Sequence, residues 1–352
     1  MELSEVLRRH WPAYERARGA KVLPSQRRAV AAILQCRTPA LGGQRWRCAE
    51  GHEHFAFHSC NHRGCPKCGH AEAQRWIQRQ QRMLLPDVPY FLATFTVPED
   101  LRATFLGAQR LCYGLLLREA AGALADLCAG RQDFEPGMVG VLHTWSRTLA
   151  YHPHAHFVVP GGGLTPGGGW RRVKKAGFLV STKPLARRFR ARFSAALKKA
   201  APELWKQVAP QVWRTTWVID IQPVGSGEAA IKYLARYVYR TALGSERIVR
   251  DEGGKVAFTY RESGTGARKV MELEAGEFIR RFLQHVLPKG FQRVRYYGWL
   301  ASAASARLDR LRALLDWREP ELKEAEALPP PKCPCCGRPM FLVGRFERGP
   351  PG

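Results

Sequence analysis

The sequence lacks any long hydrophobic run. No stretch of about 18 consecutive apolar residues occurs, which is the length that a membrane-spanning helix needs, so we expect no membrane partner. The opening residues, MELSEVLRRHWPAYERARG, are polar and lack the apolar core of a signal peptide. No internal repeat is visible either. These absences predict a cytoplasmic protein.

Acidic residues are scarce. The 352 residues include 30 Asp and Glu against 56 Lys and Arg, which gives a formal net charge of +26. Such an excess favours a polyanionic partner, because basic surfaces gain by releasing counterions from phosphates. The basic residues interleave with 10 Trp and 10 Tyr, so we interpret the charge as a sign of nucleic-acid binding rather than of a basic protein without a special partner.

Cysteine is concentrated in two short segments. Eight of the 10 cysteines lie there together with Pro, Gly and His, a pattern that favours zinc over disulfides in a cytosolic chain. Cys65-Pro-Lys-Cys68 is a tight metal-binding knuckle, and further donors can complete one or two closed, structural tetrahedral sites. The predicted zinc ligands of this segment are Cys36, Cys48, His52, Cys60, Cys65 and Cys68.

The other cysteines and histidines are not assigned to a complete zinc site. Cys333 and Cys336 supply half a zinc site, which could borrow ligands from elsewhere, bind zinc in a dimer, or bind none. Cys112 and Cys128 stand alone in an apolar, helix-like segment and are predicted to be buried packing residues. The remaining histidines of the zinc segment are interpreted as surface or DNA-facing residues, namely His54, His58 and His62.

A histidine pair lies in the segment YHPHAHFVVPGGG, residues 151–163. In an extended strand, His154 and His156 point to the same face, so both imidazoles can bind one divalent ion. A third ligand is normally needed. His143 is one candidate if residues 138–147 and 154–159 pair as a hairpin. Asp220 and Gln222, on one face of a strand predicted at 213–224, are alternatives.

A tyrosine pair lies in KYLARYVYR, residues 232–240. Tyr233 and Tyr237 are four apart, which stacks two phenols on one side of a helix, beside an apolar face and next to a cationic one. A phenol with a pKa near 10 needs positive charge to act as a nucleophile. Lys232 and Arg236 can supply it. The alternative is that the tyrosines are an aromatic packing pair, as we expect for Tyr239.

The segments together predict a mixed α+β protein. Residues 1–86 hold N-terminal helices and the zinc-binding segment, 87–318 a catalytic domain, and 319–352 an acidic, Pro-rich linker with a Cys-rich tail. The glycine-rich residues 161–170 match no nucleotide-binding loop and are predicted to form a flexible connector.

The two chemical motifs resemble a known family. HPHAH followed by YLARYVYR is similar to the HUH superfamily of single-strand endonucleases, and within it to the double-tyrosine, rolling-circle transposases of the insertion sequence ninety-one group. LHTWSRTLAYHPHAHFVVPGGG, FLATFTVPEDLR and RRFLQHVLPKGFQRVRYYGWLA resemble stretches of that family, and the Cys-rich segment resembles its N-terminal zinc-binding domain.

The resemblance implies a fold, a chemistry and a setting. It implies an HUH-type antiparallel sheet flanked by helices, with His154 and His156 binding Mg²⁺ or Mn²⁺ and Tyr233 and Tyr237 as nucleophiles. One tyrosine would attack DNA, form a 5′-phosphotyrosine and free a 3′-hydroxyl. The partners would be single-stranded DNA and element-end DNA, in the bacterial cytoplasm at the nucleoid. Zinc would be structural.

Two other functions are compatible with these motifs. A replication initiator or relaxase uses the same chemistry for another purpose, although the N-terminal zinc segment favours a transposase. In a different class, a non-catalytic zinc DNA-binding regulator would use the histidines and tyrosines only for packing.

Overall fold

The structure is a computed structural model that describes residues 1–239, 242–317 and 329–347, without the side chains of residues 236, 237 and 239. It confirms the mixed α+β class, with antiparallel sheets and helices. The chain forms two compact units. Unit 1 comprises residues 1–72, 239–286 and 321–352, and unit 2 comprises residues 73–238 and 287–320.

Unit 2 is built on one five-stranded antiparallel sheet with the order β13-β5-β6-β3-β9. Its strands are β3 (Tyr90–Thr96), β5 (Met138–Trp145), β6 (Tyr151–Pro160), β9 (Val218–Pro223) and β13 (Val294–Tyr297).

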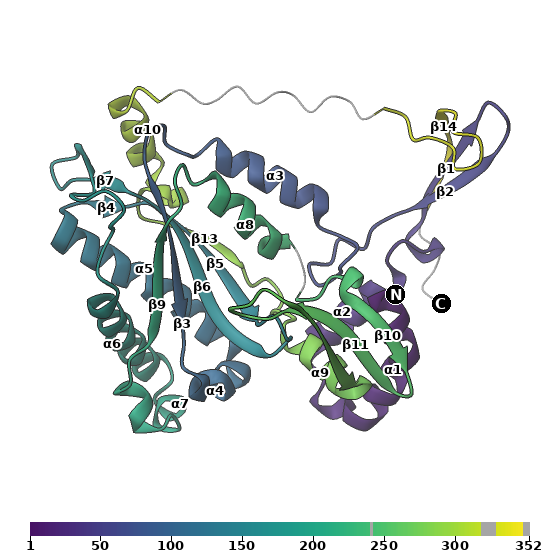
Figure 1. The fold of residues 1–352 in the computed structure, drawn as a ribbon, viewed down its shortest axis with the longest axis horizontal. Coiled ribbons are helices and arrows are strands. Elements are labelled where there is room, and N and C mark those ends of the chain that lie inside the picture. Colours follow the sequence, from purple (N-terminus) through teal and green to yellow (C-terminus); the bar gives the residue numbers. More distant parts are fainter. Residues whose placement is uncertain (240–241, 318–328, 348–352) are drawn as a thin grey trace. The chain divides into compact units, whose positions relative to one another are not determined.

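Helices cover both faces of this sheet, which is why its strands β5 and β6 are almost continuously buried (Figure 1). α5 (Gln109–Gln132) and α6 (Thr182–Ala200) pack on one face, where Phe95 of β3 contacts both Phe157 of β6 and Phe189 of α6. On the other face, α3 (His70–Gln81) and α8 (Glu228–Tyr239) contribute Trp76 and Ile231 to an apolar pocket over β5 and β6. Alternate residues of β6 therefore serve two different cores.

The glycine-rich segment is not a simple connector, so that prediction was wrong. β7 (Gly162–Leu164) lies within it and pairs with β4 (Glu135–Pro136) on one side and with β8 (Trp170–Arg172) on the other, in a small antiparallel sheet. Glycine is required here by close packing rather than by flexibility: a Cβ on Gly163 would collide with the carbonyl oxygen of Glu135. Among the described residues of unit 2, the remaining α-helices are α4 (Arg102–Gly107), α7 (Pro202–Lys206) and α10 (Ser305–Leu314).

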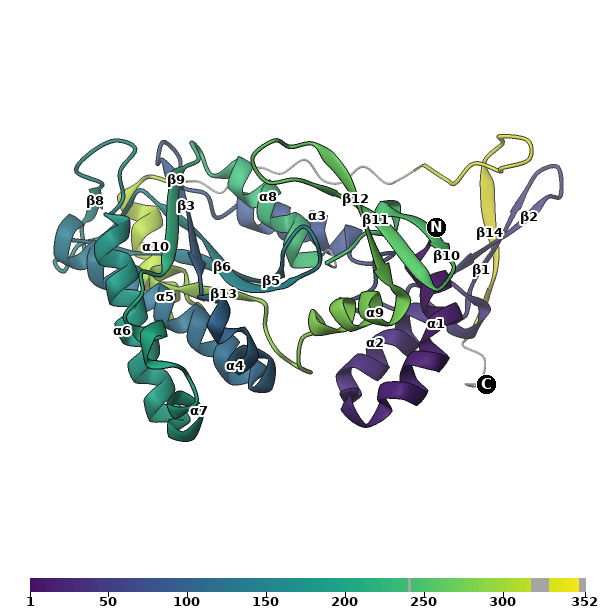
Figure 2. The ribbon, with the colours of Figure 1, turned by 60° about the horizontal axis from the view of Figure 1, so that its bottom comes forward.

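Unit 1 brings together three separate parts of the sequence. A sheet of three antiparallel strands lies beside three helices (Figure 2). The helices are α1 (Leu3–Arg18), α2 (Pro24–Gln35) and α9 (Ala275–Gln284). These strands are β10 (Ile248–Glu252), β11 (Lys255–Arg261) and β12 (Arg268–Glu274). The buried Asp251 of β10 bonds to His10 of α1 at 2.6 Å, which ties the early helix to the later sheet.

A second small sheet in unit 1 joins the two ends of the sequence. β1 (Gly43–Cys48) pairs with β2 (Glu53–Phe57) on one side and with β14 (Met340–Phe346) on the other, both antiparallel. In the segment of residues 36–70 the sequence shows no clear periodicity, and this hairpin was not predicted. As for membranes, no helix within the described residues is long and apolar enough to cross one.

The packing of β7 can be tested with a pair of glycine variants. Gly163→Ala should destabilise the protein by about 1–3 kcal/mol, because β7 must move away from β4 to admit the methyl group. Gly167→Ala, in the same segment but with open space around its Cα, should stay within about 1 kcal/mol of the original protein. Urea denaturation followed by tryptophan fluorescence measures both. Equal stability of the two variants would contradict the paired strand.

Candidate functional site

Three histidines share one face of the central sheet because of strand register. β5 pairs with β6 so that His143 lies directly opposite His154, and His156 lies two residues further along the same face of β6. This is the face that α3 and α8 cover, as the lining of the apolar pocket by Val158 of β6 also indicates. The prediction of His143 as a metal ligand required a hairpin of these two strands, and β5 and β6 form it.

The three imidazoles are close enough to share one ion. One ring nitrogen from each lies within 4.8 Å of the others. The ring centroids are 4.4 Å apart for His143 and His156, 4.9 Å for His154 and His156, and 5.1 Å for His143 and His154. Three histidine ligands with open positions for water or substrate are a known arrangement of catalytic metal sites.

Hydrogen bonds orient two of these rings. His154 donates from Nδ1 to the carbonyl oxygen of His152 at 2.7 Å, and His156 Nδ1 bonds to the Thr94 hydroxyl at 2.9 Å. The bond to a carbonyl oxygen places the proton of His154 on Nδ1 and leaves its Nε2 as the lone-pair donor, whereas the bond to Thr94 holds the ring of His156 in place. His156 Nε2 is buried and has no hydrogen-bond partner among the residues that the structure describes. The orphaned nitrogen fits a metal ligand.

Burial keeps the cluster uncharged at neutral pH. Desolvation lowers the pKa of His154 to about 4 and that of His156 to about 3, and the neighbouring histidine charge adds to the effect on His156. The pKa of His143 is also lowered, first by burial and then by the nearby His156 and His154. Neutral imidazoles present free lone pairs, so these rings can bind a cation without first losing a proton.

The tyrosine helix places one phenol beside the histidines. α8 buries Ile231, Leu234 and Val238, the face that the sequence predicted for the core. Tyr233 is 38% exposed, and its ring centroid lies 5.9 Å from that of His156 in an edge-on arrangement. It is thus neither buried in the core nor remote from the cluster.

The other residues predicted for the site are not shown in contact with the histidine cluster. Lys232 is exposed and its Nζ lies 3.4 Å from Glu228, one turn earlier in α8. The side chains of Arg236 and Tyr237 lie outside what the structure describes. Asp220 and Gln222 bond to each other on β9, which β3 separates from β6, and Asp220 is not part of the histidine group.

Three neighbours of the histidines were missed in the sequence. Thr94 reaches His156 from β3, Trp145 stacks on His143 at 5.5 Å, and Arg293 lies over the Trp145 ring at 5.5 Å. Arg293 also donates to the carbonyl oxygen of Val238 at 3.2 Å, which connects the end of α8 to the sheet. Only the alternation of FLATFT hinted at Thr94, and no local pattern pointed to Trp145 or Arg293.

Two arginines of α6 form ion pairs with the neighbouring helix α5. Arg188 and Arg192 both bond to Asp126 of α5, at 2.6 and 3.0 Å. These two guanidinium groups therefore hold α5 and α6 together.

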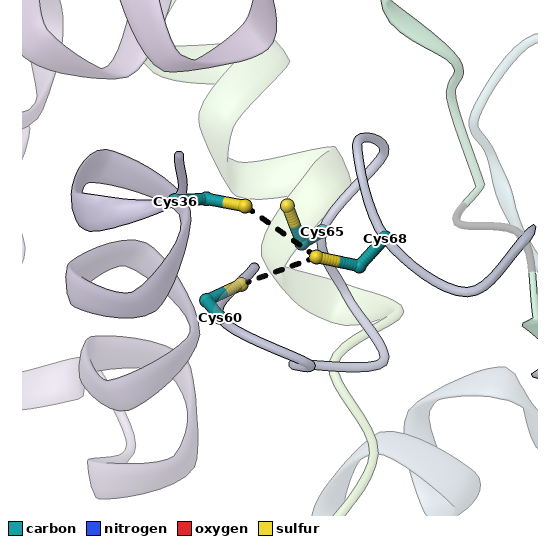
Figure 3. A group of neighbouring side chains, drawn as sticks. All are labelled: Cys36, Cys60, Cys65 and Cys68. Atoms are coloured by element: carbon teal, nitrogen blue, oxygen red, sulfur yellow. Dashed lines mark hydrogen bonds between the residues drawn. The ribbon is translucent and has the colours of Figure 1, made fainter. Parts of the chain in front are cut away.

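The predicted zinc ligands fall into two groups. Cys36, Cys60, Cys65 and Cys68 form the first, drawn in Figure 3, with sulfur separations of 3.4 Å for Cys36–Cys68 and 3.6 Å for Cys60–Cys68. Four thiols at these separations fit a closed, structural zinc site, since sulfurs about 2.3 Å from one zinc ion lie somewhat under 4 Å apart. The second group consists of Cys48, His52, Cys333 and Cys336. Neither group includes His54, His58 or His62.

Cys112 and Cys128 of α5 are fully buried in the core of unit 2, so their prediction as packing residues is confirmed.

Comparison with known proteins agrees with these features. A family model described as "Putative transposase" matches residues 137–307, which include the three histidines and α8. A second, described as "Transposase zinc-binding domain", matches residues 6–97, which include the four-cysteine group.

Two relatives are similar over most of their length. The "Putative transposase y4qJ" of Sinorhizobium fredii is 36% identical over 348 residues, covering 93% of this chain and 87% of the relative. The "Transposase for insertion sequence element IS801" of Pseudomonas savastanoi pv. phaseolicola is 29% identical over 288 residues, covering 78% and 70%. No solved structure matches the chain with statistical significance.

These findings define a transposase with a zinc-binding domain, an enzyme that acts on DNA. The chain belongs to the transposases of the insertion sequence ninety-one group, as the resemblance of its motifs predicted.

The histidine cluster can be tested by metal binding. His154→Ala should weaken Mn²⁺ binding by at least about 10-fold, because it removes one of three converging imidazoles. His152→Ala is the matched control: His152 is on the same strand but bonds to Arg102 and lies outside the group, so binding should be retained. Isothermal titration calorimetry with Mn²⁺ suits the test because thiolates do not select this ion. Equal binding by both variants would contradict the cluster.

Proposed function

We propose that this transposase nicks and rejoins single-stranded DNA through a covalent phosphotyrosine, with Tyr233 as a nucleophile. The observation that carries the proposal is the position of Tyr233. Its ring centroid lies 5.9 Å from that of His156, which belongs to a cluster of three neutral, converging imidazoles. The side chain of Tyr233 is 38% exposed, so it is accessible to a substrate beside this group.

Each residue of the cluster has a role in the proposed reaction. His143, His154 and His156 would hold Mg²⁺ or Mn²⁺, which supplies charge withdrawal from the scissile phosphate when bound. Thr94 fixes the ring of His156, and the carbonyl of His152 fixes that of His154. Arg293 anchors the end of α8 and so positions the helix that carries the phenol.

The bond changes balance without a nucleotide cofactor. Tyr233 Oη loses its proton and forms a bond to phosphorus, while the bond from phosphorus to the 3′-oxygen breaks. The 3′-oxygen takes up a proton and leaves as a hydroxyl, and the 5′-phosphate stays on the tyrosine. The ester retains the bond energy, so attack by a 3′-hydroxyl can reseal a strand. Tyr237, four residues later in α8, would allow a second cleavage before the first is resolved.

The HUH-type endonuclease fold is part of the same proposal. The supporting features are a five-stranded antiparallel sheet, a His-x-His pair on its central strand β6, and a tyrosine helix packed on the histidine-bearing face. We assign this catalysis to the region predicted at residues 87–318, with single-stranded and element-end DNA as substrates.

The nucleophile is identified by trapping the covalent adduct. A single-stranded oligonucleotide carrying an element end should yield, with Mn²⁺, a protein–DNA adduct on Tyr233 that peptide mass spectrometry locates. Tyr233→Phe removes only the hydroxyl and should lower adduct formation at that position by at least about 1,000-fold. Tyr260→Phe, a partly buried tyrosine on β11, is the control and should behave like the original protein.

Other outcomes identify the competing functions. Adducts confined to replication origins would indicate an initiator or relaxase. Nicking that persists in the variant with both Tyr233→Phe and Tyr237→Phe would indicate a metallonuclease that uses water. DNA binding without any metal-dependent nicking would indicate a non-catalytic zinc regulator.

A further inference from the structure

The second group of metal-ligand side chains joins residues from opposite ends of the sequence. Cys48 ends β1, and His52 stands in the turn to β2, whereas Cys333 and Cys336 precede β14. Cys48 and Cys336 are 288 positions apart. The zinc-binding family model ends at residue 97 and so assigns nothing to the C-terminal pair.

The turn between β1 and β2 is shaped to present two donors. The amide of Cys48 donates to the carbonyl oxygen of His52 at 3.1 Å, and the amide of Gly51 donates to that of Cys48 at 3.0 Å. Gly51 has a φ of 81°, a left-handed conformation that glycine adopts without strain. The tight turn brings Cys48 Sγ within 3.4 Å of His52 Nδ1.

The loop before β14 has the matching form of a metal knuckle. The amide of Cys333 donates to the carbonyl oxygen of Arg338 at 2.7 Å, and Gly337, at φ 73°, donates to that of Cys333 at 2.8 Å. This closed loop places both cysteines on the side of the β1 turn. Cys336 Sγ lies 3.8 Å from Cys48 Sγ.

These separations fit one tetrahedral zinc ion. With zinc about 2.3 Å from sulfur and about 2.0–2.1 Å from nitrogen, tetrahedral donors lie roughly 3.4–3.8 Å apart. The observed 3.4 and 3.8 Å agree, and all four ligand atoms lie within 4.8 Å of one another. A disulfide needs sulfurs at about 2.05 Å, so the pair Cys48 and Cys336 is not one.

We propose that Cys48, His52, Cys333 and Cys336 bind a second structural zinc ion, which joins the C-terminal strand β14 to the N-terminal hairpin. Three thiolates and one imidazole are an established structural donor set and leave no position for substrate. The inference is independent of the nicking chemistry, since none of these residues belongs to the histidine cluster.

The small buried core of this sheet supports a stabilising role for the metal. Its buried apolar cluster consists of Cys48, Cys333 and Met340, with Trp46 against them. The ion pair between Arg338 and Glu50, at 3.1 Å, is largely exposed and therefore adds little. A three-stranded sheet with so small a core is marginal in water, and a metal is a common way to stabilise one. The six-residue pairing of β1 with β14 would thus depend on zinc.

Metal content of the full-length protein tests the proposal. The variant with both Cys333→Ser and Cys336→Ser should contain one zinc equivalent fewer per chain than the original protein, measured by inductively coupled plasma mass spectrometry. Cys335→Ser is the matched control, because Cys335 is exposed in the same loop but lies outside the group. It should retain the full zinc content. Unchanged zinc content in the double variant would overturn the proposal.

A second measurement distinguishes loss of this one site from general misfolding, which would also release zinc. Hydrogen exchange should rise in β1 and β14 of the double variant, while α5 and the central sheet of unit 2 stay protected. Exchange in β14 as slow as in the original protein would overturn the proposal. So would a zinc-dependent dimer in light scattering, because the knuckle would then bind the ion together with another copy. Oligonucleotide nicking is a separate readout, so failure of either inference leaves the other testable.

Discussion

The pairing of β5 with β6 is the constraint on which the candidate site depends. Side chains alternate between the two faces of a strand, so a register shift of one residue would turn His154 and His156 into the core beneath α5. The register is fixed from that side, since Phe157 packs against Phe95 of β3. The apolar residues between and after the histidines thus determine where the imidazoles point.

The same burial that fixes the strands prepares the imidazoles chemically. Water would stabilise their protonated forms, whereas the covered face of the sheet does not, and the pKa of His156 is lowered to about 3 for that reason. Nδ1 of His156 bonds to the Thr94 hydroxyl, so Nε2 is the nitrogen that remains to bind a metal ion. Covering the face with α8 also brings Tyr233 to the edge of the cluster, so core packing and site assembly have one cause.

The sequence predicted what depends on local periodicity. Spacing by two on a strand and by four on a helix identified the histidines and tyrosines, and spacing by three identified the knuckle Cys65–Cys68. Contacts between distant segments have no such signal. Thr94 and Arg293 reach the site from β3 and from the loop before β13, and nothing in their neighbouring residues marks those contacts. The glycine-rich segment was misjudged because glycine is favoured both by flexible connectors and by strands that approach another backbone closely.

The four-cysteine group and the proposed second zinc site differ in how much of the chain must be synthesised before each can form. Cys36 and Cys68 are 32 positions apart, so the first site can close while the rest of the protein is still being synthesised. The second would require Cys336, 288 positions after Cys48. The entropy of closing a flexible loop grows only with the logarithm of its length, so this separation does not preclude a stable link. It does impose an order. The hairpin β1–β2 would be only marginally stable until β14, the last strand of its sheet, has been synthesised. A chain truncated before β14 would lack both that strand and half of the proposed metal ligands.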